Sequence, residues 1–128
     1  MERKKKILVV DDEIEFLNMI KLRLEASGYD VVTATNGKEV FDRIREHKPD
    51  AILLDILLPG MNGLEVLKRI RNENKQIPVF IITAFSSQER FELANKFNAS
   101  GFIVKTQDIK TEIDNITSIL RVSDKYKG

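Results

Sequence analysis

The chain has 128 residues, 42% of them hydrophobic, which is enough for one packed core and leaves no room for a second folded domain. Its 21 basic and 20 acidic residues give a formal net charge of +1, so charge gives no reason to expect a nucleic-acid or membrane partner. The lack of cysteine excludes disulfides and thiolate metal sites. With no secretory signal or membrane-spanning run expected, the chain fits the cytoplasm.

Strand-like and helix-like segments alternate along the chain. Residues 7–10 form a short apolar run, typical of a strand buried on both faces. Apolar side chains then recur at helical spacing from Ile14 to Leu24, and Gly28 can end this helix in the left-handed conformation. Residues 31–35 alternate more strongly, which predicts a strand at the edge of the sheet.

The same alternation continues to the end of the chain. Apolar runs again predict buried strands, and apolar residues three or four apart predict amphipathic helices. In order, we expect a helix at residues 40–44, a strand at 51–54, a helix at 64–70, a strand at 79–82, a helix at 93–97, a strand at 102–104 and a helix at 109–120.

A β-α unit repeated five times predicts an α/β fold, because each helix forces a right-handed crossover between parallel strands. We expect a flavodoxin-like, doubly wound, five-stranded parallel sheet of order 2-1-3-4-5 with five helices. Residues 1–122 are expected to form this domain, and residues 123–128 a polar C-terminal tail.

Polar residues stand where four of the apolar runs stop: Asp11, Asp12, Asp55, Thr83 and Lys105. Parallel strands end at the same edge of a sheet, and open α/β folds bind ligands at that edge, where the strand order reverses. The sequence therefore predicts one site that contains all five side chains.

The three carboxylates of this set would repel one another unless a cation joined them. Oxygen ligands without histidine or cysteine select Mg²⁺, Mn²⁺ or Ca²⁺, and a site with few protein ligands suits Mg²⁺ best. The single histidine, His47, lies far from these positions in the sequence, and we assign it no role.

Each polar residue also has a purely structural alternative. Asp12 could cap the first helix with Glu15 in a capping box, Asp55 could cap a turn, Thr83 could cap the fourth helix, and Lys105 could be an ordinary exposed lysine. Independent caps have no reason to meet in one crevice, so the joint set favours a functional site.

Four motifs resemble the receiver domain of two-component response regulators. They are VVDDE at residues 9–13, LLDILLPGMNG at 53–63, IITA at 81–84 and GFIVK at 101–105. The resemblance runs from about residue 6 to residue 120, with every motif in order. It is this joint occurrence that carries the resemblance.

The resemblance implies a role for each site residue. Asp55 is expected to be the phosphoacceptor, and Mg²⁺, or Mn²⁺ in its place, would be bound by Asp12, Asp55 and the backbone carbonyl of Leu57, with Asp11 acting through water. Lys105 would pair with a phosphoryl oxygen.

The resemblance also implies a switch. Thr83 would move toward the phosphoryl group and Phe102 would turn inward, which would remodel the face made by the fourth helix, fifth strand and fifth helix. The family more often has tyrosine at the position of Phe102, and a proline, often after a cis peptide bond, at the position of Thr106. Leu57 and Phe85, both apolar, should flank the path of water to the phosphoryl group, so we expect slow self-dephosphorylation.

The expected function is a phosphoacceptor switch of a two-component or phosphorelay system, not an enzyme beyond its own phosphoryl transfer and autodephosphorylation. Its partners would be a sensor histidine kinase or phosphotransfer protein and a downstream target protein, with no membrane and no direct nucleic-acid binding, and it would be a monomer or a phosphorylation-dependent dimer. Two alternatives stay open: the receiver half of a longer DNA-binding regulator, and a receiver-like binding module that never takes phosphate. A haloacid-dehalogenase-like phosphatase is disfavoured, because Leu57 stands where such enzymes usually carry a second aspartate.

Overall fold

The computed structural model describes residues 4–58, 60–84, 87–105 and 108–125. Its main sheet has five parallel strands in the order β2-β1-β3-β6-β7. The strands are β1 (Lys6–Val10), β2 (Asp30–Ala34), β3 (Ala51–Asp55), β6 (Val79–Thr83) and β7 (Gly101–Val104). β6 and β7 are the fourth and fifth predicted strands, so the predicted order 2-1-3-4-5 is confirmed, with β2 at an edge.

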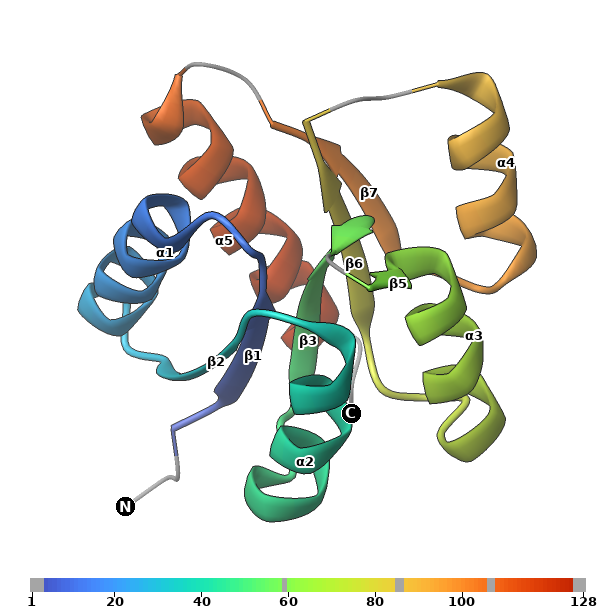
Figure 1. The fold of residues 1–128 in the computed structure, drawn as a ribbon. Coiled ribbons are helices and arrows are strands. Elements are labelled where there is room, and N and C mark those ends of the chain that lie inside the picture. Colours follow the sequence, from blue (N-terminus) through green and yellow to red (C-terminus); the bar gives the residue numbers. More distant parts are fainter. Residues whose placement is uncertain (1–3, 59, 85–86, 106–107, 126–128) are drawn as a thin grey trace.

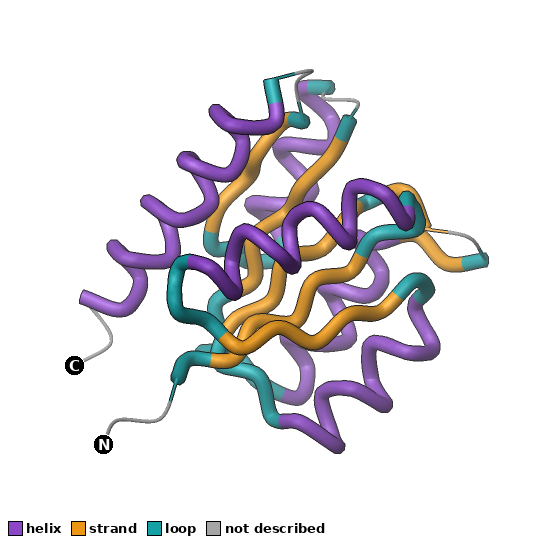
Figure 2. The backbone as a smooth tube through the Cα atoms, turned by 90° about the vertical axis from the view of Figure 1, so that its left-hand side faces the viewer, coloured by secondary structure: helices purple, strands orange, loops and turns teal. Residues whose placement is uncertain are grey.

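Five helices cover the two faces of this sheet: α1 (Ile14–Ala26), α2 (Gly37–His47), α3 (Gly63–Glu73), α4 (Gln88–Lys96) and α5 (Ile109–Lys125). α1 and α5 lie together on one face, whereas α2, α3 and α4 cover the other (Figure 1). In the rotated view the strands form a middle layer between helices (Figure 2). The expected doubly wound α/β fold is therefore confirmed.

Two separate cores follow from the alternation of side chains along the central strands. Ile7 and Val9 of β1 pack toward α1 and α5, whereas Leu8 and Val10 pack toward the opposite helices. All four are almost fully buried. Alternate residues of a strand point to opposite faces, so a strand buried on both sides must be apolar throughout.

A short antiparallel hairpin after β3 was not predicted. Its strands are β4 (Leu57–Leu58) and β5 (Met61–Asn62), and it leads directly into α3. A Cβ atom added to Gly63, the first residue of α3, would lie 2.3 Å from the carbonyl oxygen of Asp55 and 2.6 Å from the Cα of Ile56. Only glycine fits this close approach between the start of α3 and the end of β3.

Neither Asp12 nor Thr83 caps a helix, so these two structural alternatives are wrong. α1 begins after Glu13, which is its N-cap and makes no side-chain cap hydrogen bond, so Asp12 is not the cap. α4 is capped by Ser87, whose hydroxyl accepts a hydrogen bond from the Arg90 N–H (3.1 Å), so Thr83 does not cap it either. The predicted end of α1 is confirmed, because Gly28 follows the helix with a φ of +97°.

Arg71 is a buried charged residue near the C-terminus of α3, outside the predicted site. Its guanidinium donates hydrogen bonds to the carbonyls of Ile77 (2.7 Å), Asn98 (2.8 Å) and Asn74 (3.2 Å), and lies 3.4 Å from the Ser100 hydroxyl. It thus connects the end of α3 with the segments that lead into β6 and β7.

Among the described residues, no helix has the length and apolar character needed to cross a lipid bilayer.

Candidate functional site

The carboxyl ends of β1, β3, β6 and β7 lie side by side at one edge of the sheet. The register aligns Val10 with Leu54, so the residues that follow these two are neighbours across β1 and β3. Asp55 is aligned with Ile82, and the N–H of Lys105 donates a hydrogen bond to the carbonyl of Thr83 (2.7 Å). The five polar residues predicted to meet therefore all stand at this edge.

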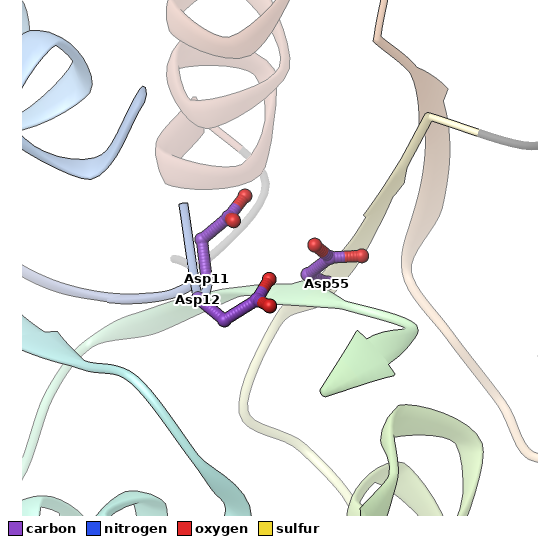
Figure 3. A group of neighbouring side chains, drawn as sticks. All are labelled: Asp11, Asp12 and Asp55. Carbon is purple, nitrogen blue, oxygen red and sulfur yellow. The ribbon is translucent and has the colours of Figure 1, made fainter. Parts of the chain in front are cut away.

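Three carboxylates gather there, from Asp11, Asp12 and Asp55. One oxygen of each lies within 4.8 Å of the others, and Figure 3 shows two side chains from the end of β1 beside one from the end of β3. Asp11 and Asp55 are buried, with 1% and 4% of their surface exposed, whereas Asp12 is exposed. Two of the three carboxylates are thus buried, and the third leaves the cluster open to solvent on one side.

Local backbone hydrogen bonds orient the two buried carboxylates. The Glu13 N–H donates to Asp11 Oδ1 (2.9 Å), and the Leu57 N–H donates to Asp55 Oδ1 (3.0 Å). An aspartate that accepts from the N–H two residues ahead forms a compact turn without help from the rest of the fold. The structural alternative for Asp55, a turn cap, therefore coexists with its place in the cluster.

The ammonium of Lys105 contacts three carboxylates. Its Nζ lies 2.5 Å from Asp11 Oδ2, 3.0 Å from Glu13 Oε1 and 3.3 Å from Asp55 Oδ2. On another side it lies 4.3 Å from the centroid of the Phe16 ring, a cation–π distance. Only 8% of the lysine side chain is exposed, so the alternative of an ordinary surface lysine is wrong.

Burial controls the charge states of this cluster. Loss of solvation raises the pKa of Asp11 to about 6, against the opposing effect of Lys105, and it also raises the pKa of Asp55. Burial disfavours the charge on Lys105, but the hydrogen bond and charge of Asp11, with Asp55 and Glu13, outweigh it and raise the lysine pKa. Lys105 is therefore a stable cation beside two carboxylates, Asp11 and Asp55, that bind protons more readily than usual.

The residues present fit a divalent cation. Asp11 Oδ2 is buried and accepts no hydrogen bond of good geometry from the described residues, although it contacts the Lys105 ammonium. A second cation at the cluster would offset the carboxylate repulsion that a single lysine leaves. All the side-chain donors are hard oxygens, which suits Mg²⁺.

His47 has no place in this site. It ends α2, and its carbonyl accepts a hydrogen bond from Nζ of Lys6 at the start of β1 (3.2 Å). The start of β1 is at the opposite edge of the sheet from the carboxylates, so the expectation that His47 has no role in the site agrees with its position.

The two switch candidates lie on neighbouring strands. Thr83 is completely buried at the end of β6. Phe102 of β7 is half-buried and meets Phe91 of α4 edge to face, with 5.5 Å between ring centroids and 77° between ring planes. The other expectations for this region, on Phe85 and Thr106, lie outside the described residues.

Two contacts of Lys105 were missed at the sequence level. Glu13 belongs to the VVDDE motif but was given no role, and Phe16 was simply one more apolar position next to the first helix pattern. Each contact joins residues about ninety positions apart, and neither periodicity nor spacing reports such a pair.

The model of the response regulator receiver domain matches residues 7–117. The chain belongs to this family. Receiver domains are signalling domains of two-component systems; they bind Mg²⁺ at an acidic pocket and interact with histidine kinases or phosphotransfer proteins.

Two curated relatives differ in how much of their length this receiver domain spans. The chain is 36% identical over 120 residues to the alkaline phosphatase synthesis transcriptional regulatory protein PhoP of Bacillus subtilis, and the match covers 94% of this chain and 50% of PhoP. It is 35% identical over 118 residues to the polar-differentiation response regulator DivK of Brucella anthropi, covering 91% of this chain and 96% of DivK. The receiver domain thus spans half of one relative and nearly all of the other.

A solved structure supports the same assignment of the fold. The CheY-like receiver domain protein of Methanospirillum hungatei superposes with a TM-score of 0.86 at 28% identity, covering 96% of this chain and 98% of that one.

Proposed function

We propose that this receiver domain is a phosphorylation switch in which Asp55 accepts a phosphoryl group. The observation that carries the proposal is the buried Asp55 carboxylate, with two further carboxylates within 4.8 Å and the Lys105 ammonium 3.3 Å away. A nucleophilic carboxylate, a place for a cation and a fixed positive charge are what phosphoryl transfer requires.

In the transfer step, a carboxylate oxygen of Asp55 attacks the phosphorus of a phosphohistidine on the kinase or phosphotransfer protein. The new oxygen–phosphorus bond forms as the phosphorus–nitrogen bond breaks, and its electron pair returns to the imidazole. The product is an acyl phosphate on Asp55. Because the transition state spreads negative charge over the phosphoryl oxygens, catalysis consists mainly of alignment and neutralisation.

Asp12, Asp55 and the backbone carbonyl of Leu57 would hold Mg²⁺, and Asp11 would hold it through water. When bound, Mg²⁺ neutralises charge on the phosphoryl oxygens. Mn²⁺ would suit the same oxygen donors. Asp11 also keeps Lys105 beside the acceptor through its own ion pair with the ammonium.

Lys105 would pair with one phosphoryl oxygen and the Thr83 hydroxyl would bind another. The resulting shift of Thr83 and inward turn of Phe102 would change the face formed by α4, β7 and α5. A ligand shifts such an equilibrium only by binding one state better, and the phosphoryl group does so through Lys105 and Thr83. Phe102 starts from an edge-to-face contact with Phe91, so α4 is directly coupled to its movement.

The proposed partners are a sensor histidine kinase or phosphotransfer protein upstream and a protein target downstream, in the cytoplasm, with no membrane partner and no direct nucleic-acid binding by this chain. The chain would work as a monomer or as a phosphorylation-dependent dimer. Residues 123–128 would be a polar tail. The match to half of PhoP keeps the receiver half of a longer regulator as a second form of the same proposal.

The alternative from another class is a binding module that never takes phosphate. The complete set of Asp11, Asp12, Asp55, Thr83 and Lys105 favours the switch, because a module without phosphoryl chemistry has no need of a buried carboxylate beside a buried lysine. Burial of charged groups is unfavourable unless they are paired or functional.

Intact-mass measurement after incubation with Mg²⁺ and acetyl phosphate tests the proposal. We expect the gain of one phosphoryl group, which requires Mg²⁺ and is lost in Asp55→Asn. This variant removes the charge and nucleophile but keeps the shape of the side chain. A folded, metal-binding protein that gains no mass would refute the switch and favour the constant binding module.

A further inference from the structure

We propose that Glu13 restrains Lys105 in the resting protein and competes with the phosphoryl group for its ammonium. Glu13 would thereby lower the affinity of the site for a phosphoryl group. The inference rests on the proposed function, because it concerns the same lysine. Glu13 is a positioning residue, since it acts only through Lys105.

The Lys105 ammonium has few free sides. A lysine ammonium has three N–H groups, and three carboxylates approach Lys105 Nζ: Asp11 at 2.5 Å, Glu13 at 3.0 Å and Asp55 at 3.3 Å. The Phe16 ring closes a further side. Glu13 and Asp55 each accept a hydrogen bond from the ammonium, and Asp11 Oδ2 and the Phe16 ring lie against its other sides. Contact with a phosphoryl oxygen therefore requires one of these partners to move away.

Glu13 differs from the other two carboxylate partners of Lys105. Asp11 and Asp55 belong to the carboxylate cluster that fits a cation, and phosphorylation of Asp55 converts its carboxylate into an acyl phosphate. Asp11 would be drawn toward the cation and Asp55 would lose its carboxylate charge, so both partners hold Lys105 less strongly as the site fills. Glu13 is outside that cluster, and its charge persists in the phosphorylated state. It is the competitor that remains.

Glu13 is also the exposed partner of the buried lysine. The Glu13 side chain is 61% exposed, whereas the lysine side chain it contacts is 8% exposed. Glu13 therefore holds the solvent-facing side of the ammonium and can be changed without opening the core. An ion pair with one exposed partner is weak, so removal of the carboxylate should change affinity about two- to fivefold.

The test is the affinity for beryllofluoride, a phosphoryl mimic, measured in Mg²⁺ for the wild-type protein, Glu13→Gln and Glu15→Gln. Glu15 is exposed in the same turn and its substitution makes the same change of charge, but it has no ion pair with Lys105. We expect about two- to fivefold tighter binding by Glu13→Gln than by Glu15→Gln.

A second background separates the contact from a general structural effect. In Lys105→Met, Glu13→Gln should change beryllofluoride affinity no more than Glu15→Gln does, because the coupling requires the ammonium. In the background that keeps Lys105, Glu13→Gln could bind beryllofluoride no more tightly than Glu15→Gln does. That result would overturn the proposal for Glu13 and leave the proposed function standing. A wild-type protein that binds no beryllofluoride would overturn the proposed function as well.

Discussion

Replacement of Arg71 by methionine should destabilise the domain strongly, although Arg71 is outside the functional site. Methionine keeps an unbranched apolar stem of similar length but removes every donor from the carbonyls of Ile77, Asn98 and Asn74. A hydrogen bond from a charged donor contributes about 1.5–3 kcal/mol, so the two bonds of 2.7 and 2.8 Å together contribute about 3–6 kcal/mol. Loop carbonyls that bind water in the variant recover part of this hydrogen-bond energy, so we expect the free energy of unfolding to fall by about 3 kcal/mol.

Urea denaturation followed by circular dichroism measures the change in the free energy of unfolding. Arg69→Met is the matched control, because Arg69 is exposed on the same helix. Its guanidinium makes a long cation–π contact, 5.9 Å from the centroid of the Phe41 ring. This control should lose less than about 1 kcal/mol. Hydrogen exchange should also accelerate at the Ser100 N–H, which donates to the Val79 carbonyl (2.7 Å). A loss below about 1 kcal/mol for Arg71→Met would refute the reasoning, because it would mean that the carbonyls do not depend on the guanidinium.

Two further predictions concern the site itself. Burial raises the pKa of Asp11 to about 6, so protons compete with Mg²⁺ for this carboxylate. Measured by calorimetry, the affinity for Mg²⁺ should fall about tenfold from about pH 7.5 to about pH 5, and Asp11→Asn should remove most of this pH dependence. Equal Mg²⁺ affinities of the wild-type protein at both pH values would contradict this prediction. Leu57, two residues after Asp55, is 41% exposed, and its apolar side chain offers an attacking water no hydrogen-bond partner. The acyl phosphate should therefore last minutes rather than seconds without a phosphatase, and Leu57→Asn should shorten its lifetime in a radiolabel decay assay.

The architecture could be predicted because its signals are local. Apolar runs such as 51–54 and 79–82 are apolar at every position, and only strands covered on both faces need that composition. The polar residues that end these runs then meet because parallel strands share an edge. The presence of Asp55 and Lys105 in one site thus followed from strand order.

Other features depend on contacts that no local pattern reports. The β4–β5 hairpin has two residues in each strand, too few for a periodic signal. α4 begins at Gln88, five residues before the first apolar position that predicted it, because its first turn is polar and exposed. The contacts of Lys105 with Glu13 and Phe16 depend on side-chain conformations across the fold.

The close approach of Gly63 to the end of β3 has a consequence for how this site can evolve or be redesigned. The carbonyl of Asp55 lies against the backbone at the start of α3, so main-chain atoms fix how closely the end of β3 and the start of α3 approach each other. Main-chain atoms cannot be exchanged for smaller or larger ones, as side chains can. Side-chain substitutions around the cluster can therefore change its charge and its solvent access while the backbone of Asp55 stays in position. An exposed neighbour such as Leu57 can vary in this way, whereas at position 63 any side chain would collide with the backbone of β3.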